Sequence, residues 1–275
     1  MLLERPMPNF RFWLFATLLA AAVGLKIHAD MVPLRNSVIL ETANPALAGL
    51  RIAALSDLHL ADDPSSLNRM ATVLEAVDAS QPDVIFLLGD YTGHPSDISD
   101  LQAHRTAVAE LLATLKSAPV LAVLGNYESW DDRQAWAWEL SQAGVRILEN
   151  EVEMLEIAGR SLCVRGIGDA FTHNHRETQF PPSCQGAGLL TLTHDPYAAF
   201  DLALEGLVLA GHTHCGQVSL PMFGPLWVPS QAPRAATCGE YREGALTLWV
   251  SAGLGTSLLP IRFWAPASWD LLTLQ

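Results

Sequence analysis

Short apolar runs that end in polar residues recur along the chain, and stretches with helical spacing separate the first of them. The apolar runs and the loops that follow them lie at 50–60, 83–93, 119–129, 188–196 and 206–214. Helical spacing of apolar residues is present at 66–79, 101–116 and near 131–143. Further strand-like runs lie at 145–148, 152–158, 161–168, 245–251 and 269–274. Short uniformly apolar runs are typical of buried strands, and their alternation with helices predicts an α/β layered core.

The N-terminus departs from this pattern. An uncharged, mostly apolar run extends from Phe12 to Leu25, with a basic residue on each side. We interpret residues 1–30 as a membrane anchor or a signal segment, since the run is short for a full span but flanking basic side chains extend its apolar reach. A buried N-terminal helix is the alternative. Residues 31–49 are predicted to be a linker, and residues 50–275 a single functional domain.

Composition narrows the classes of function. The 275 residues carry a formal net charge of −13, which argues against a nucleic-acid partner, because phosphate backbones are bound by clustered Lys and Arg. The four cysteines include no C-x-x-C pair, so a structural zinc site of the usual spacing is not expected. One or two disulfides are possible, and the redox compartment stays open.

Side chains that can bind metals follow five of the apolar runs. In α/β sheets such positions gather at the carboxyl edge of the sheet, where ligands bind. Carboxylate, amide and imidazole donors together suit Mn²⁺, Fe or Zn²⁺ better than Ca²⁺. A glycine precedes three of these residues, at positions 89, 125 and 211, and predicts a sharp turn there. The candidate ligands are Asp57, His59, Asp90, Asn126, His194, His212 and His214.

The motifs that contain these residues resemble those of a known family. "SDLHL", "LLGDYTG", "LGNYE", "LTHDP" and "GHTHCGQ", in this order within residues 50–217, are similar to the signature of the calcineurin-like metallophosphoesterases. The tail segments "LPMFGPLWVPS" and "SAGLGTSLLPIRF" are similar to a membrane-associated bacterial branch of that family. The resemblance implies a four-layer α/β/β/α sandwich with mixed sheets. It also implies a catalytic domain over residues 50–275.

The resemblance further implies a binuclear centre of two divalent metal ions, Mn, Fe or Zn. Asp57, His59 and His214 would hold one ion. Asn126, His194 and His212 would hold the other, and Asp90 would bridge both. A hydroxide between the two metals would then attack phosphorus in line with the leaving oxygen.

One motif departs from the family pattern. Where the family has Gly-Asn-His followed by Asp or Glu, this chain has Gly-Asn-Tyr-Glu, with Tyr127 in the place of a histidine that contacts the substrate phosphate. Tyr127 and Glu128 are therefore candidate substrate-binding residues, and Asp90, Asn126 and Tyr127 are the candidate catalytic residues. Tyrosine has a pKa near 10 and is a poor proton donor at neutral pH.

Three interpretations follow from Tyr127. The substrate has a good leaving group, such as a nucleotide phosphate; or His94 or His173 takes over the missing role; or the site binds metals and hydrolyses little. The last interpretation makes the chain a metal-binding scaffold that acts through a partner. His173 and His175 are otherwise expected in a solvated loop, and Cys215 is expected to be a small buried packing residue.

The expected function is hydrolysis of a phosphodiester or pyrophosphate bond in a lipid-linked or nucleotide-linked small molecule. The branch implies a role like that of a UDP-diacylglucosamine pyrophosphatase, at the inner membrane of a bacterium, on a side that the sequence leaves open. Trp136 and Trp138, two residues apart on a predicted helix, cannot both face the core. With Phe223 and Trp227 they suggest a lipid-facing rim, and ordinary packing is the alternative.

Overall fold

The computed structural model describes residues 13–15, 17, 33–220 and 222–275. The predicted anchor or signal segment, residues 1–30, therefore lies almost wholly outside the described residues. Within the described part of the chain, no helix has both the length and the apolar character needed to cross a bilayer.

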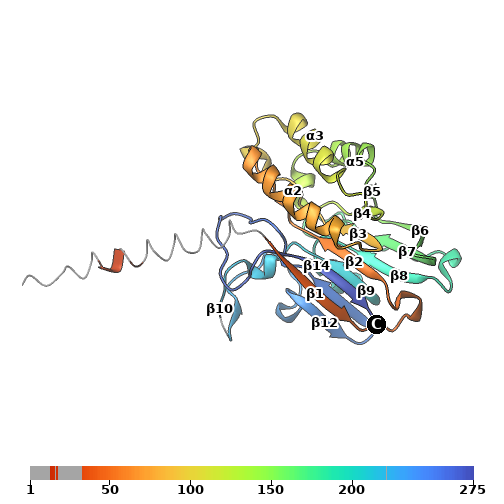
Figure 1. Ribbon diagram of the computed structural model, residues 1–275. Coiled ribbons are helices and arrows are strands. Elements are labelled where there is room, and N and C mark those ends of the chain that lie inside the picture. The colour runs from red at the N-terminus through yellow and green to blue at the C-terminus, as the bar shows by residue number, and fades with distance from the viewer. Residues whose placement is uncertain (1–12, 16, 18–32, 221) are drawn as a thin grey trace, which may run out of the picture.

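Two mixed six-stranded sheets form the frame of the molecule (Figure 1). The first has the order β1-β14-β2-β3-β4-β5, and its strands are parallel except where β14 meets β2. Buried apolar runs form its central strands, as expected for a sheet covered on both faces. The bounds are β1 (Leu34–Leu40), β2 (Arg51–Leu55), β3 (Val84–Leu87), β4 (Val120–Ala122), β5 (Arg146–Ile147) and β14 (Ser268–Leu274).

The second sheet has the order β12-β13-β9-β8-β7-β6, with antiparallel pairs at its two edges and parallel pairs between them. A two-stranded hairpin lies outside both sheets. The bounds are β6 (Glu151–Ile157), β7 (Arg160–Gly166), β8 (Gly188–Leu192), β9 (Gly206–Ala210), β12 (Gly239–Glu243) and β13 (Leu246–Val250), with β10 (Ser219–Leu220) and β11 (Gly224–Pro225) in the hairpin.

Helices cover the outer faces of the sheets. Three longer helices, α2 (Pro64–Ala79), α3 (Leu101–Leu112) and α5 (Arg133–Gln142), pack on the first sheet, and each begins after an aspartate whose carboxylate caps its first turn. The outer layer on the second sheet is thinner and includes the five-residue helix α6 (Tyr197–Asp201). The short helix α4 (Asn126–Trp130) follows β4. The 3-10 helices are η1 (Pro45–Leu47), η2 (Pro95–Asp97), η3 (Pro182–Cys184), η4 (His214–Gly216) and η5 (Arg234–Ala236).

The main core lies between the two sheets. Ile52 and Phe86 of the first sheet and Leu190 and Leu209 of the second are completely buried there. Because each sheet buries one face against the other and one against its outer layer, the expected α/β class with two mixed sheets is confirmed.

The linker prediction for residues 31–49 is wrong for residues 34–40. These residues form β1, which pairs in parallel with β14 over seven positions at the edge of the first sheet. An edge strand leaves part of its surface to solvent, so its sequence, LRNSVIL, lacks the uniformly apolar pattern of the central strands. The folded domain therefore begins before residue 50.

Two disulfides cross-link the second half of the chain, Cys163 to Cys184 and Cys215 to Cys238. The expectation that Cys215 only fills space is thus wrong. Its bond ties the loop after β9 to the segment just before β12. The sequence left this pairing open because spacing does not reveal which cysteines meet in the fold.

Candidate metal centre

The candidate ligands come together at the carboxyl ends of five strands from both sheets. Asp57 and His59 follow β2, Asp90 follows β3, Asn126 opens α4 after β4, His194 follows β8, and His212 and His214 follow β9. All seven side chains are buried or nearly so. The two sheets face each other, so these loops meet at one end of the sandwich.

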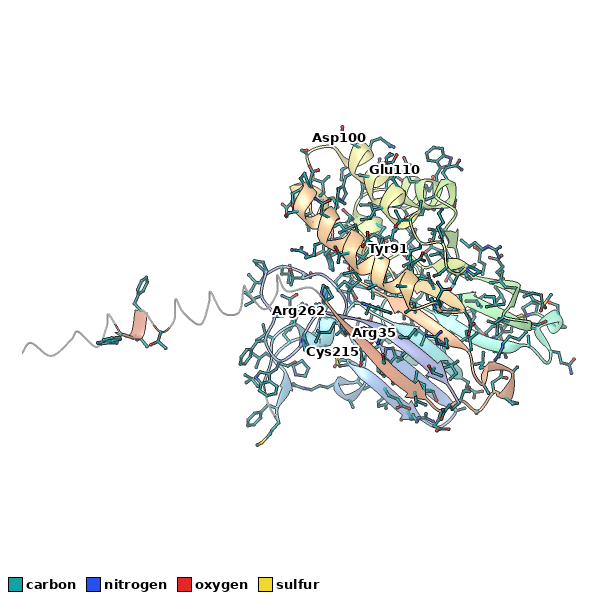
Figure 2. All side chains as sticks on the ribbon, in the orientation of Figure 1. Arg35, Tyr91, Asp100, Glu110, Cys215 and Arg262 are labelled. Carbon is teal, nitrogen blue, oxygen red and sulfur yellow. A yellow bond between two sulfur atoms is a disulfide. The ribbon has the colours of Figure 1, made fainter. Side chains whose placement is uncertain are left out.

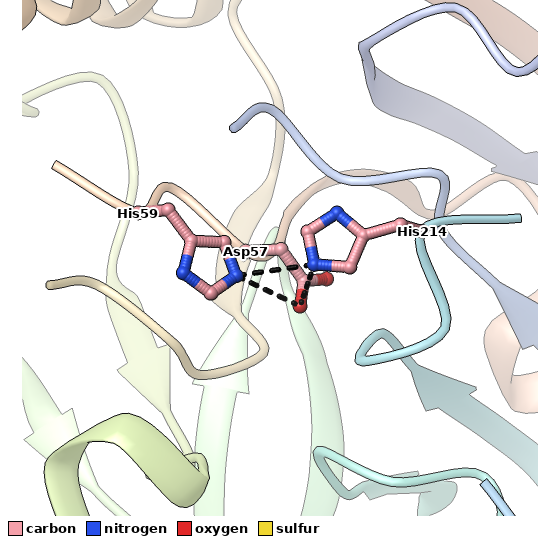
Figure 3. Close-up of side chains that lie close together, drawn as sticks. All are labelled: Asp57, His59 and His214. Carbon is pink, nitrogen blue, oxygen red and sulfur yellow. Dashed lines mark hydrogen bonds and ion pairs between the residues drawn. The ribbon is translucent and has the colours of Figure 1, made fainter. Parts of the chain in front are cut away.

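Asp57, His59 and His214 form the first of two groups whose ligand atoms lie within 4.8 Å of one another (Figure 3). The Nε2 atoms of His59 and His214 are 3.1 Å apart. The Asp57 Oδ1 atom lies 3.4 Å from Nε2 of His214 and 3.9 Å from Nε2 of His59.

Asp90, His194 and His212 form the second group. The His194 Nε2 atom lies 3.3 Å from Oδ2 of Asp90, 3.2 Å from Nδ1 of His212 and 3.2 Å from Oδ1 of Asn126. The same Oδ2 atom of Asp90 is 3.6 Å from Nε2 of His59, in the first group. One carboxylate oxygen therefore faces both groups.

Hydrogen bonds on the far side of two imidazoles fix which nitrogen faces inward. The His194 Nδ1 atom lies 2.6 Å from the Leu88 carbonyl oxygen, and Nε2 of His212 lies 3.3 Å from that of Pro229. A carbonyl only accepts, so each of these nitrogens carries a proton and the opposite nitrogen presents a lone pair or a second proton to the cluster. Converging imidazole and carboxylate donors with such outer partners fit a divalent cation.

The backbone at this site is unusual. Left-handed φ values between 42° and 67° occur at five of the seven candidate ligands. Side chains other than glycine rarely adopt this region, and such residues cluster at functional sites where the surrounding structure enforces them. The five residues are Asp57, His59, Asp90, His212 and His214.

The charges around the two groups are uneven. Burial lowers the pKa of His59, and burial together with the neighbouring His59 and Arg262 lowers the pKa of His214 well below its usual value. Both imidazoles are therefore neutral and keep a lone pair at neutral pH. Burial is the largest single influence on His194 and lowers its pKa, but the charge and hydrogen bond of Asp90, together with the charges of Asp57 and Asp169, outweigh burial and raise the pKa of His194. A bound cation would compete with that proton for the same nitrogen.

Arg262 is a site residue that sequence reasoning missed. Arg262, which Figure 2 labels, is fully buried. Its guanidinium lies 3.1 Å from Nδ1 of His214, on the side away from the first group, and donates to the carbonyl oxygens of Ala252, Gly255 and Ala265. Burial lowers its pKa to about 10, so it stays charged at neutral pH. The quoted tail motif contains this arginine, but nothing in its spacing signals a contact with a histidine 48 positions away.

Tyr127 lies directly above the first group. Its ring meets the His59 ring edge to face at 4.5 Å, its amide donates to Asp90 Oδ1 at 3.0 Å, and its hydroxyl is 2.8 Å from Oγ of Ser257. Burial raises its pKa above the usual value. The phenol therefore remains protonated, as a hydrogen-bonding group beside the candidate ligands.

The structure places Glu128 away from the cavity lining, unlike the position that a substrate-binding role would need. The side chain is completely buried, and its carboxylate accepts hydrogen bonds from the amides of Asp90, Tyr91 and Gly125 at 2.7–2.9 Å. It joins the loop after β3 to the loop after β4. Burial raises its pKa to about 7, and the charge of Asp90 acts in the same direction. Its neighbour in sequence, Tyr127, points to the cavity, whereas the helical turn of α4 turns Glu128 inward.

Neither ligand group includes any of the other histidines singled out in the sequence, His94, His173 and His175. His94 is exposed, and the centroid of its ring lies 5.9 Å from that of the Tyr127 ring. His173 is exposed, as the solvated-loop interpretation expects. The His175 side chain is only 11% exposed and pairs with Asp201 at 2.8 Å, so it does not fit that interpretation. Trp136 is completely buried and Trp138 is exposed, as the helical spacing predicts for such a pair.

A cavity of about 280 Å³ opens beside both groups. Its polar lining includes Asp90, Asn126, Tyr127, His212 and His214. The rest of the lining is mainly apolar, with side chains such as Trp130, Phe171, Leu226, Trp227, Leu258 and Leu259.

Comparison with known proteins identifies the class. Residues 50–216 match the family model of calcineurin-like phosphoesterases, and the chain belongs to that family. It is therefore a metal-dependent phosphoester hydrolase, and the expectation of an enzyme of this kind is confirmed.

Its relatives share much of its length. An uncharacterized metallophosphoesterase, YkuE of Bacillus subtilis, is 31% identical over 82% of this chain and 79% of its own. The phosphodiesterase YaeI of Escherichia coli is 28% identical over 76% of each chain. A zebrafish (Danio rerio) transmembrane protein with a metallophosphoesterase domain is 27% identical over 90% of this chain, which spans only 59% of that relative.

Proposed function

We propose that this protein is a binuclear hydrolase of phosphodiester or pyrophosphate bonds in lipid-linked or nucleotide-linked substrates. The observation that carries the proposal is the position of Asp90. Its Oδ2 atom lies within 3.6 Å of a histidine nitrogen in each of the two groups, as a bridging ligand must. Asp57, His59 and His214 would hold one cation and Asn126, His194 and His212 the other.

The chain's own residues have separate roles in this proposal. When bound, two divalent cations would neutralise the phosphoryl oxygens and lower the pKa of an attacking water. The Leu88 and Pro229 carbonyls keep His194 and His212 in the orientation that directs a nitrogen to the cluster. Tyr127, protonated and at the cavity wall, would donate a hydrogen bond to a phosphoryl oxygen.

The substrate class follows from the cavity and from Tyr127. An apolar lining beside a phosphate site suits an ester or anhydride that carries an apolar group. Because the raised pKa makes Tyr127 a weak proton donor, the bond cleaved should have a leaving group that needs little protonation, such as a nucleotide phosphate.

We place the catalytic domain at the oxidising face of a bacterial inner membrane. Two disulfides in the described part of the chain support that side, since cytosolic thiols are generally kept reduced. Protease added to intact spheroplasts should then cleave the domain. Protection until the cells are lysed would count against this placement.

The first test uses the full chain, stripped of metal and reloaded with Mn²⁺, on a bis-aryl phosphodiester and a mono-aryl phosphate. Asp90→Asn should reduce metal-dependent turnover of the diester at least about 100-fold, because even the outer partners of metal ligands contribute 10–100-fold. The matched control is Asp97→Asn, an exposed carboxylate in η2, which should leave turnover within about threefold. Equal rates for the two variants would refute the bridging role.

Tyr127 separates an adapted enzyme from a metal-binding scaffold. In an adapted enzyme, Tyr127→Phe removes only the hydroxyl and lowers the rate, and Tyr127→His changes it little. A protein that binds two metals, turns over neither ester and gains a high rate from Tyr127→His would instead support the scaffold.

A further inference from the structure

Large apolar side chains are exposed on two neighbouring loops beside the candidate metal centre. One loop is the β10–β11 hairpin with the residues just after it, and the other precedes β14. Their apolar side chains are between 36% and 98% exposed. We call this set the apolar rim: Met222, Phe223, Leu226, Trp227, Leu258, Leu259, Phe263 and Trp264.

Hydrogen bonds join the two loops into one surface. The Ser219 amide donates to the Phe263 carbonyl at 2.8 Å, and the Phe263 amide donates to the Gln217 carbonyl at 2.8 Å. The Gln217 side-chain amide donates to the Leu259 carbonyl at 2.7 Å. The exposed side chains of both loops are therefore held on one connected unit.

Charged side chains are missing from the sequence of both loops. Residues 217–233 and 244–261 contain no Asp, Glu, Lys or Arg, and Arg262, which follows, is completely buried. The exposed Arg234 is a charged side chain that contacts the rim, and its guanidinium donates to the Phe223 and Pro225 carbonyls of the hairpin. Single exposed apolar residues are ordinary on protein surfaces, but a connected apolar patch of this kind marks an interaction site.

The rim is continuous with the cavity at the metal centre. Leu226, Trp227, Leu258 and Leu259 line the cavity wall, and the same cavity reaches Asp90. Whatever covers the rim therefore also lies at the mouth of the site.

The start of the folded domain lies beside the rim. The Leu34 amide, at the beginning of β1, donates to the Ala267 carbonyl at 3.0 Å, three residues beyond Trp264. In Figure 1, β1 begins on the side of the molecule that carries β10. The uncharged apolar sequence 12–25 ends nine positions before Leu34, a distance of about 30 Å at most for an extended chain.

We propose that the apolar rim inserts into the surface of a lipid bilayer, so that the cavity of the metal centre opens at the membrane. A tether of at most about 30 Å keeps the rim close to any bilayer that takes up the apolar N-terminal sequence. The formal charge of −13 gives no attraction to anionic lipids, so burial of apolar side chains drives the contact. This surface is independent of the metal assignment.

Tryptophan quenching in vesicles tests the contact directly. The full chain is reconstituted into phosphatidylcholine vesicles with or without bromine on the acyl chains, and the fluorescence lost to bromine is compared. Trp227→Phe and Trp264→Phe should each remove about a quarter to a third of the quenched signal, since only tryptophans at the acyl boundary are reached. The matched control is Trp138→Phe, on α5, which is 60% exposed, close to the 61% and 66% of Trp227 and Trp264.

The outcomes separate the bilayer from other occupants. The proposal predicts that Trp138→Phe leaves the quenched signal unchanged and that the losses at Trp227 and Trp264 persist in 1 M salt, because apolar insertion is not screened. If neither rim variant changes the quenched signal, the proposal of membrane insertion is overturned. The rim would then be covered by a second copy of the chain or by the chain's own N-terminal sequence. The assay needs neither metal nor substrate, so its result tests membrane contact independently of the proposed activity.

Discussion

Gly125→Ala tests whether close packing of two loops places the central carboxylate. Gly125 has a φ of −97°, which any residue can adopt, so conformational freedom does not explain this glycine. The lack of space explains it, because a Cβ atom at position 125 would lie 2.2 Å from Oδ1 of Asp90 and 2.7 Å from the backbone nitrogen of Asp90. The turn expected at position 125 is thus a close approach, whereas Gly89, with a φ of +94°, does require the freedom of glycine.

The size of the effect follows from that contact. Ordinary contacts begin at about 3.4 Å, so the loops must separate by close to 1 Å. Overpacking of this kind costs about 1–3 kcal/mol, and the stiffer unfolded chain of the alanine variant recovers about 0.4–1 kcal/mol. The middle of these ranges leaves a net loss of about 1 kcal/mol, or about 2–4 °C in Tm. Because Asp90 moves by up to an ångström, turnover should fall about 100-fold.

The assays are thermal unfolding followed by circular dichroism and Mn²⁺-dependent turnover of the bis-aryl phosphodiester. The matched control is Gly93→Ala, in the loop that also carries Asp90, where the nearest atom to an added Cβ is the Leu60 carbonyl oxygen at 3.2 Å. That contact is relieved by a shift of a few tenths of an ångström, so turnover should change less than about fivefold. If Gly125→Ala behaves like Gly93→Ala in both assays, the steric explanation is wrong.

Three further predictions concern stability. Asp63→Ala, which removes the cap of α2, should cost about 1 kcal/mol near neutral pH. Hydrogen bonding, first of all from the Ser65 hydroxyl, lowers the pKa of Asp63 in the folded state. The stabilisation by the cap is therefore present above pH 3.8 and is lost as pH falls through the lower folded-state pKa. A stability difference between Asp63→Ala and wild type that persists at pH 2 would contradict this pH dependence. Replacing Cys215 and Cys238 together by serine should lower the free energy of unfolding by about 3 kcal/mol in urea titrations, as expected for a cross-link over 23 positions, and an unchanged midpoint would count against it. Arg262→Lys should cost about 2–4 kcal/mol in the same titration, because a single ammonium cannot reach the carbonyls that the planar guanidinium joins; a loss below about 0.5 kcal/mol would show that the arginine is dispensable.

The spacing of apolar residues predicted the helices and strands whose formation depends on neighbouring residues in the sequence. The helix predicted at 66–79 corresponds to α2, and the strand predicted at 269–274 to β14, because spacing on a helix or strand reflects which face is buried. The helix predicted at 101–116 ends at Leu112. Boundaries of this kind depend on the last hydrogen-bonded turn rather than on apolar spacing.

Features that require distant partners could not be predicted in this way. β1 was missed because its strand partner, β14, lies more than 220 residues along the chain and its own sequence is typical of an edge. Glu128 lies next to a residue that faces the cavity, and only the turn of α4 decides that it points to buried amides instead.

The sequence by itself therefore determined the candidate donor set. A polar residue at the end of an apolar strand is a local signal, and the order of five such ends is a property of the chain. Tertiary structure decided which donors share a group, that one oxygen of Asp90 faces both groups, and that Arg262 lies behind His214. These are contacts between segments far apart in sequence, and their geometry is set by how the two sheets pack, which no local spacing encodes.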